Sequence, residues 1–127
     1  EVMIASLMTP FDSETDILNP NMVKVVTDSK QNAIYFSRSP IPYNRDNSTD
    51  CRYFRHIGIY GFRYAALTHF VDLPIGKLEA IEKLEQLRAL EHGIPIRMVN
   101  TDYRGIGIDT PEDLEKVSQT IAKGSIK

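Results

Sequence analysis

The segment RGIGIDTPEDL at positions 104–114 constrains the fold most, because it joins an extended segment to the start of a helix. Thr110 is a preferred N-cap residue, and Pro111 fits the first helical turn, where its missing amide proton costs no hydrogen bond. The two acidic residues that follow favour the positive end of the helix dipole. The segment therefore predicts a helix at 110–122, with Asp109 immediately before it.

Asp109 ends the glycine-containing extended segment, and its position has two interpretations. Ligands of open α/β sheets collect where strands end, and a carboxylate there can bind a divalent cation. Alternatively, Asp109 only helps to cap the helix. The local pattern leaves both interpretations open.

Segments with strand character alternate with helical segments along the rest of the chain. We expect strands at 2–7, 22–27, 33–37, 53–63 and 94–99, and further helices at 64–70 and 77–92. Turn-forming residues at 28–32 join two of these strands in a hairpin. The order of the elements predicts an α/β fold, an open sheet with a β-hairpin excursion.

The strand at 53–63, YFRHIGIYGFR, carries the most unusual side chains. A period of two places one set of residues on a single face: Phe54, His56, Gly58, Tyr60 and Phe62. Glycine between His56 and Tyr60 leaves a recess in which a hydroxylated ligand can lie, whereas Ile57 and Ile59 face the core. The alternative is a structural histidine beside a glycine that a close backbone approach requires.

The helix at 77–92 is expected to pack on the sheet through an apolar stripe. The stripe consists of Leu78, Ala80, Ile81, Leu84 and Leu87. Glu85 lies on the shoulder of this stripe, and Gln86 projects elsewhere. Spacing alone favours an ion pair between Glu85 and Arg88, three residues apart on the helix.

Composition excludes several classes of protein. The 127 residues, 42% of them hydrophobic and 25% charged, describe one ordinary soluble domain. A formal charge of -2 argues against a nonspecific nucleic-acid surface. The single cysteine, Cys51, excludes an internal disulfide framework, and we expect a cytoplasmic protein without a membrane segment. The sequence has no glycine-rich phosphate loop, so chemistry on a nucleotide needs parts outside this chain.

Five blocks of the sequence resemble one enzyme family, the 3-deoxy-manno-octulosonate (KDO) cytidylyltransferases or CMP-KDO synthetases, and they follow the family's order. The blocks are NPNMVKVV at 19–26, YFSRSPIPYNRD at 35–46, RHIGIYGFR at 55–63, LEQLRALEHG at 84–93 and GIGIDTPEDLEKV at 105–117. They match only the C-terminal half of the family's sequence. The resemblance therefore implies that residues 1–127 form the C-terminal half of a single cytidylyltransferase domain, the part that binds the sugar acid and dimerises.

The resemblance implies a mixed open sheet of the nucleotide-diphospho-sugar transferase (Rossmann-like) type, and an activity. In the family, KDO attacks the α-phosphate of CTP, pyrophosphate leaves, and CMP-KDO enters lipopolysaccharide biosynthesis. Mg2+ is the implied cofactor, since a cation screens the phosphates and acidifies the attacking hydroxyl. Asp109 matches the family's catalytic, metal-binding aspartate.

The resemblance also implies a substrate-binding set. This set is Arg38, His56, Tyr60, Glu85 and Gln86. Arg38 is the implied partner of the KDO carboxylate, through charge-assisted hydrogen bonds, and the other residues are expected to bind hydroxyls. Ile106 departs from the family, which commonly has threonine or a similar small polar residue between the two glycines.

The resemblance also implies a homodimer joined through this half of the chain. We therefore expect a homodimer with KDO and CTP as substrates and no nucleic-acid or membrane partner. A chain without the N-terminal half is expected to be inactive and poorly monomeric, because its sheet lacks core strands. Two alternatives remain open: a nucleotidyltransferase for another acidic sugar, and a noncatalytic sugar-binding or dimerisation module.

Overall fold

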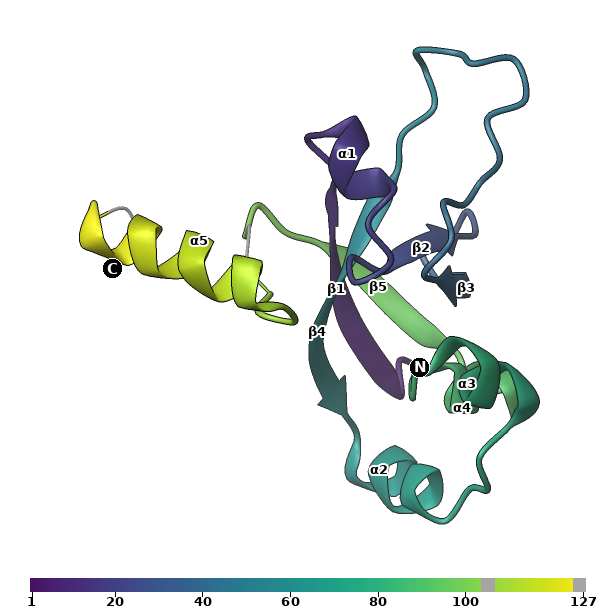
Figure 1. The fold of residues 1–127 in the computed structure, drawn as a ribbon. Coiled ribbons are helices and arrows are strands. Elements are labelled where there is room, and N and C mark those ends of the chain that lie inside the picture. Colours follow the sequence, from purple (N-terminus) through teal and green to yellow (C-terminus); the bar gives the residue numbers. More distant parts are fainter. Residues whose placement is uncertain (104–106, 125–127) are drawn as a thin grey trace.

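A computed structural model describes residues 1–103 and 107–124 (Figure 1). Within these residues the elements are β1 (Ile4–Pro10), α1 (Glu14–Ile17), β2 (Lys24–Thr27), β3 (Ala33–Ser37), β4 (Phe54–Phe62), α2 (Tyr64–Val71), α3 (Lys77–Glu82), α4 (Leu87–Glu91), β5 (Ile96–Asn100) and α5 (Pro111–Ala122). The strands form one mixed open sheet in the order β3-β2-β4-β1-β5. Only the β1–β5 pair is parallel among these strands, and the α/β class with an open sheet is confirmed.

The predicted hairpin is present as β2 and β3. The Asp28 carboxylate accepts hydrogen bonds from the backbone amides of Lys30 and Asn32, both at 2.9 Å, and so closes the turn. Gln31 takes the left-handed conformation inside it, with φ of 67°. The hairpin lies at the opposite edge of the sheet from β5 in strand order, but its turn curves back to β5, where the Met98 amide donates to the Gln31 carbonyl at 2.7 Å.

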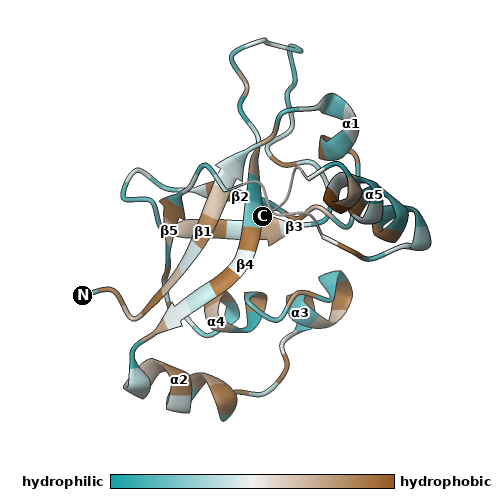
Figure 2. Ribbon diagram, turned by 90° about the vertical axis from the view of Figure 1, so that its left-hand side faces the viewer, coloured by the Kyte–Doolittle hydropathy of each residue, from teal (hydrophilic) through white to brown (hydrophobic). Residues whose placement is uncertain are grey.

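The helices α2, α3 and α4 lie together on one side of the sheet (Figure 2), and this face of the sheet forms the hydrophobic core with α2, α4 and the turn before α4. The buried side chains of this core include Ile4, Met8, Val25, Phe36, Leu84, Leu87, Ala89, Ile96 and Met98. Alternation along each strand supplies this face, because residues two apart point the same way. The core therefore fixes the positions of β4 and of the turn before α4, which carry most of the predicted substrate-binding residues.

The predicted pattern for Ile57 and Ile59 is only half correct. Ile57 is buried, whereas Ile59 is 57% exposed. The pairing of β1 with β4 shifts between Ser6 and Leu7, so that Ser6 is opposite Tyr60 and Leu7 is opposite Ile57. This bulge removes Ile59 from the regular alternation.

The predicted helix at 77–92 is in fact two helices, α3 and α4. Lys83 ends α3 in the left-handed conformation, with φ of 57°, and the chain then turns before α4 begins. The predicted apolar stripe is therefore wrong in its first half, where Leu78, Ala80 and Ile81 are exposed. Leu84 and Leu87 are buried as predicted, because the turn rotates the second half of the segment independently of the first.

The helix predicted at 110–122 is confirmed as α5, and Thr110 is its N-cap. Figure 1 shows α5 extending from the sheet on the side away from α3 and α4. None of its residues is buried, and Leu114 and Ile121 are 55% and 57% exposed. No helix formed by the described residues is long and apolar enough to cross a membrane.

Candidate functional site

His56 lies on the core face of β4, where two side chains fix its state. The Ser6 hydroxyl is 2.8 Å from His56 Nε2, and the Gln86 amide nitrogen is 3.3 Å from His56 Nδ1. Because an amide NH2 group only donates, Nδ1 accepts and Nε2 carries the proton donated to Ser6. The Ser6 hydroxyl donates in turn to the carbonyl of Ile59, at 2.9 Å. Burial lowers the pKa of His56 from 6.5 to about 4, so the ring is neutral at pH 7.

Tyr60, Glu85 and Gln86 line one cavity of about 270 Å³. Apolar side chains form the rest of its wall: Ile4, Phe62, Leu67, Phe70, Val71, Ala89 and Ile96. Burial, and secondarily the charge of Glu85, raises the pKa of Tyr60 above its ordinary value, which keeps the hydroxyl protonated. The ring of His56 lies behind Tyr60, with 5.5 Å between the ring centroids.

Four of the predicted substrate-binding residues are therefore brought together by β4 and the turn before α4. Tyr60, Gln86 and Glu85 line the cavity and contribute a phenol, an amide and a carboxylate, whereas the neutral imidazole of His56 lies behind Tyr60 and contacts Gln86. This combination of donors and acceptors suits a polyhydroxylated ligand, with the apolar wall excluding water. Gly58 does not serve a close backbone approach, since a Cβ added there meets nothing within 4 Å.

Arg38 follows β3 and does not line this cavity. Its guanidinium donates to three backbone carbonyls, those of Pro20, Glu82 and Lys83, at 2.9, 2.8 and 3.2 Å. Its backbone amide donates to the Glu82 carboxylate at 3.0 Å. Arg38 thus ties the end of α3 to the hairpin in this structure, and its predicted contact with a sugar carboxylate stays a prediction.

Asp109 lines a different cavity, of about 500 Å³, between the end of β1, α1 and α5. Arg55 also lines this cavity. Because Arg55 and His56 are neighbours in a strand and point to opposite faces, β4 separates the two cavities. The structure therefore does not bring Asp109 together with the residues around His56.

The helix cap of α5 does not use the Asp109 carboxylate. Thr110 Oγ1 accepts from the Asp113 amide at 3.1 Å, and the Asp113 carboxylate accepts from the Asp109 and Thr110 amides at 3.1 and 3.2 Å. The capping interpretation of the Asp109 side chain is therefore wrong. Its expected place at a strand end is also not found, because β5 ends at Asn100. Two residues of the predicted glycine segment, Gly105 and Ile106, lie outside the described residues.

The described residues around Asp109 do not form a complete metal site by themselves. No group of three histidine, cysteine or acidic side chains within residues 1–103 and 107–124 is arranged to hold a metal ion. Mg2+, however, is commonly bound by one or two carboxylates together with substrate phosphates and water. The buried Thr9 hydroxyl lines the same cavity and has no hydrogen-bond partner within the described chain, which marks a polar position that a ligand can satisfy.

Two residues that organise the site were missed in the sequence. Ser6, which fixes the tautomer of His56, is buried at the same alternate positions of β1 as Ile4 and Met8. A polar residue among these alternating core positions could have indicated its role. Glu82 accepts from Arg38 and from the Tyr35 hydroxyl, at 3.0 Å in both cases. Its role depends on where α3 ends, which no local pattern indicates.

Comparison with known proteins confirms the resemblance. A family model described as "Cytidylyltransferase" matches residues 1–99. The 3-deoxy-manno-octulosonate cytidylyltransferase of Solibacter usitatus is 50% identical over 126 residues, which are 99% of this chain and 50% of the relative. That of Flavobacterium johnsoniae is 58% identical over 116 residues, which are 91% of this chain and 48% of the relative.

The fold agrees with these sequences. A solved structure of CMP:2-keto-3-deoxy-manno-octonic acid synthetase complexed with CTP matches with a TM-score of 0.85 and 42% identity. The match covers 97% of this chain and 50% of the solved chain, and this chain spans about half the length of the curated relatives it matches. We conclude that this chain belongs to the cytidylyltransferase family.

Proposed function

We propose that this chain supplies the C-terminal half of a 3-deoxy-manno-octulosonate cytidylyltransferase. The complete enzyme transfers CMP from CTP to KDO, releases pyrophosphate and provides CMP-KDO for lipopolysaccharide biosynthesis in the cytoplasm. The observation that carries the proposal is the cavity bounded by Tyr60, Glu85 and Gln86, with neutral His56 behind it, in a fold shared with half of a synthetase that binds CTP.

The open surface of the chain supports a half-fold. Leu114 and Ile121 on α5 are more than half exposed, and Val99 on the β5 edge is 48% exposed. Apolar area of this kind is normally covered by further structure. We propose that the remaining half of the fold packs on α5 and β5, and that the chain alone is inactive because it lacks a phosphate-binding loop.

In the assembled enzyme, meaning this chain together with the remaining half, the cavity lined by Tyr60, Glu85 and Gln86 binds the sugar acid. Tyr60 and Gln86 donate to sugar hydroxyls, and Glu85 accepts from them. His56 orients Gln86 by accepting one of its amide protons at Nδ1. Arg38 approaches the sugar carboxylate by exchanging one or more of its three carbonyl contacts for a charge-assisted hydrogen bond.

Asp109 holds Mg2+ together with a ligand from the remaining half and the phosphates of CTP. When bound, the cation screens the phosphate charge and favours ionisation of the attacking hydroxyl. Asp109 suits this role because its carboxylate is not used by the helix cap and faces the larger cavity.

A second copy of the chain covers the apolar surface beside α2. Its exposed side chains are Ile59, Tyr64, Leu67, Val71 and Ile75. They extend from β4 through α2 to the loop that contains Pro74. The homodimer proposal rests on this surface.

The variant Asp109→Asn tests the metal role in the assembled enzyme. We expect turnover, measured as pyrophosphate release with CTP, KDO and Mg2+, to fall at least about a hundredfold, because a neutral amide binds Mg2+ poorly. The matched control is Glu112→Gln, which neutralises an exposed acidic residue in the first turn of α5 that does not line this cavity. Equal losses in the two variants, or unchanged turnover in Asp109→Asn, would remove Asp109 from the metal site.

A further inference from the structure

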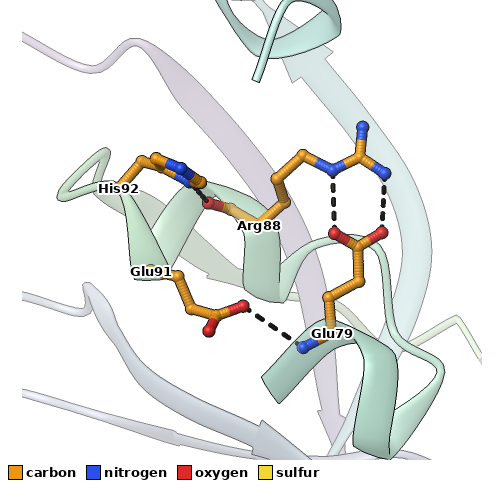
Figure 3. A network of polar contacts seen from close by, with 4 residues as sticks. All are labelled: Glu79, Arg88, Glu91 and His92. Atoms are coloured by element: carbon orange, nitrogen blue, oxygen red, sulfur yellow. Dashed lines mark hydrogen bonds and ion pairs between the residues drawn. The ribbon is translucent and has the colours of Figure 1, made fainter. Parts of the chain in front are cut away.

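The helices α3 and α4 are joined by a network of polar contacts that includes an ion pair (Figure 3). Arg88 on α4 makes two parallel bonds to the Glu79 carboxylate on α3, at 2.8 and 2.6 Å. Glu91 on α4 accepts from the backbone amides of Leu78 and Glu79, at 3.0 and 3.2 Å. The first turn of α3 is thus tied to two positions along α4.

The Glu79–Arg88 pair is shielded from solvent. The two side chains are 6% and 16% exposed, and the Arg88 guanidinium lies 5.1 Å from the centre of the Phe70 ring, which lines the cavity. Hydrogen bonds from Arg88 hold the pKa of Glu79 below its usual range. A bidentate pair in such surroundings has a strongly preferred geometry.

Arg88 has a second acidic residue within reach. Glu85 lies three residues earlier, in the turn before α4, and it lines the cavity. This turn holds the two residues close together, with the Arg88 amide donating to the Glu85 carbonyl at 3.0 Å. The pKa of Arg88 is raised mainly by its hydrogen bonds to Glu79, and the negative charge of Glu85 raises it further. Because Arg88 is bound by Glu79 at both Nε and Nη2, the Glu85 carboxylate stays available to the cavity.

We propose that Glu79 is a positioning residue that keeps Arg88 away from Glu85, so that the Glu85 carboxylate can bind a hydroxyl of the sugar acid. This inference rests on the proposed function of the cavity. Glu79 touches no ligand and acts only through Arg88. Its removal frees Arg88 to neutralise Glu85.

Kinetics of the assembled enzyme test this role. We expect Glu79→Gln to raise KM for KDO about tenfold, the loss of roughly one charge-assisted hydrogen bond, with kcat and KM for CTP within about twofold of the parent. The double variant Glu79→Gln with Arg88→Met removes the competing cation and keeps an apolar side chain against Phe70. Its KM for KDO should return most of the way to the parent value. The matched control is Glu1→Gln, which breaks an ion pair with Arg63 whose side chains are 69% and 55% exposed, and should change neither constant.

A spectroscopic measurement separates this inference from the proposed function. The 15N resonance of Arg88 Nε, recorded without ligand, should move in Glu79→Gln and move again when Glu85→Gln is added. Two results would overturn the positioning role. One is an Arg88 Nε resonance that does not move when Glu85→Gln is added, and the other is a KM for KDO that stays as high in the double variant with Arg88→Met as in Glu79→Gln. If the resonance moves as expected while KM for KDO is unchanged, the fault lies with the sugar-acid function of the cavity.

Discussion

At the residue scale, the chemistry of the smaller cavity depends on a histidine that burial keeps neutral. Ser6 and Gln86 occupy its two ring nitrogens, so His56 orients an amide and is not free to exchange protons with solvent. A charged imidazolium would lose the hydrogen bond from Gln86, because Nδ1 would then also donate. The state of this one ring therefore couples the stability of the fold to the geometry of the site.

This coupling predicts a pH dependence of stability. The pKa of His56 is about 4 in the folded chain and 6.5 as its reference value, so the unfolded state binds more protons between these values. Neutral, buried His56 therefore contributes fully to the free energy of unfolding above about pH 6.5. This contribution is lost as the pH falls, and at pH 4 the loss is roughly 3 kcal/mol. Urea unfolding at pH 7 and pH 4 measures it.

Carboxylates also titrate in this range, so the informative quantity is a difference between variants. The loss of stability between pH 7 and pH 4 should be smaller by most of that amount in His56→Gln. His69→Gln, which changes an exposed histidine on α2, should keep the parent's pH dependence. An equal pH dependence in His56→Gln and the parent would contradict the neutral, buried state of His56.

At the element scale, the turn between α3 and α4 decides where the site residues point. The left-handed Lys83 ends α3, and the side chains of Glu82, Arg88 and Glu91 then connect the two short helices to each other and to β3. Helices of five or six residues have little stability of their own, so these contacts and the core set their positions. Glu85 and Gln86 reach the cavity because they lie in this turn.

Gly76 tests the connection at the start of α3. A Cβ at this position would overlap the Glu91 carboxylate, which caps the first amides of the helix. We expect Gly76→Ala to lower the free energy of unfolding by about 1 kcal/mol, the usual cost of losing such a cap. Gly61→Ala is the control, because a Cβ there meets nothing within 4 Å. Equal effects of the two substitutions on urea unfolding would rule out this role of Gly76.

Local patterns predicted the strands, the hairpin and α5, because alternation and capping residues act within a few positions. They did not predict the break in the helix at 77–92, since Lys83 adopts a conformation usually signalled by glycine. The predicted Glu85–Arg88 ion pair was wrong for the same reason, because the break in the helix lets Arg88 pair with Glu79 instead. The grouping of His56, Tyr60, Glu85 and Gln86 came from the family resemblance, since it depends on contacts between distant segments.

At the scale of the whole molecule, the chain has one well-packed side and one open side. The core lies between the sheet and the helices α2 and α4, whereas α5 has no buried residue. Arg38 and Asp109 lie outside the smaller cavity. This position is expected if contacts with the substrates and with the remaining half of the fold complete the site. We propose that the two cavities serve the sugar acid and the metal-bound nucleotide, and that they act together only in the assembled enzyme.

Mixing the purified chain with the N-terminal half of a curated relative tests the central claim most directly. Pyrophosphate release should be absent from either half alone and appear on mixing, and it should require CTP, KDO and Mg2+ together. A mixture in which the halves bind each other but turn over without KDO, or in which they do not associate at all, would contradict the account.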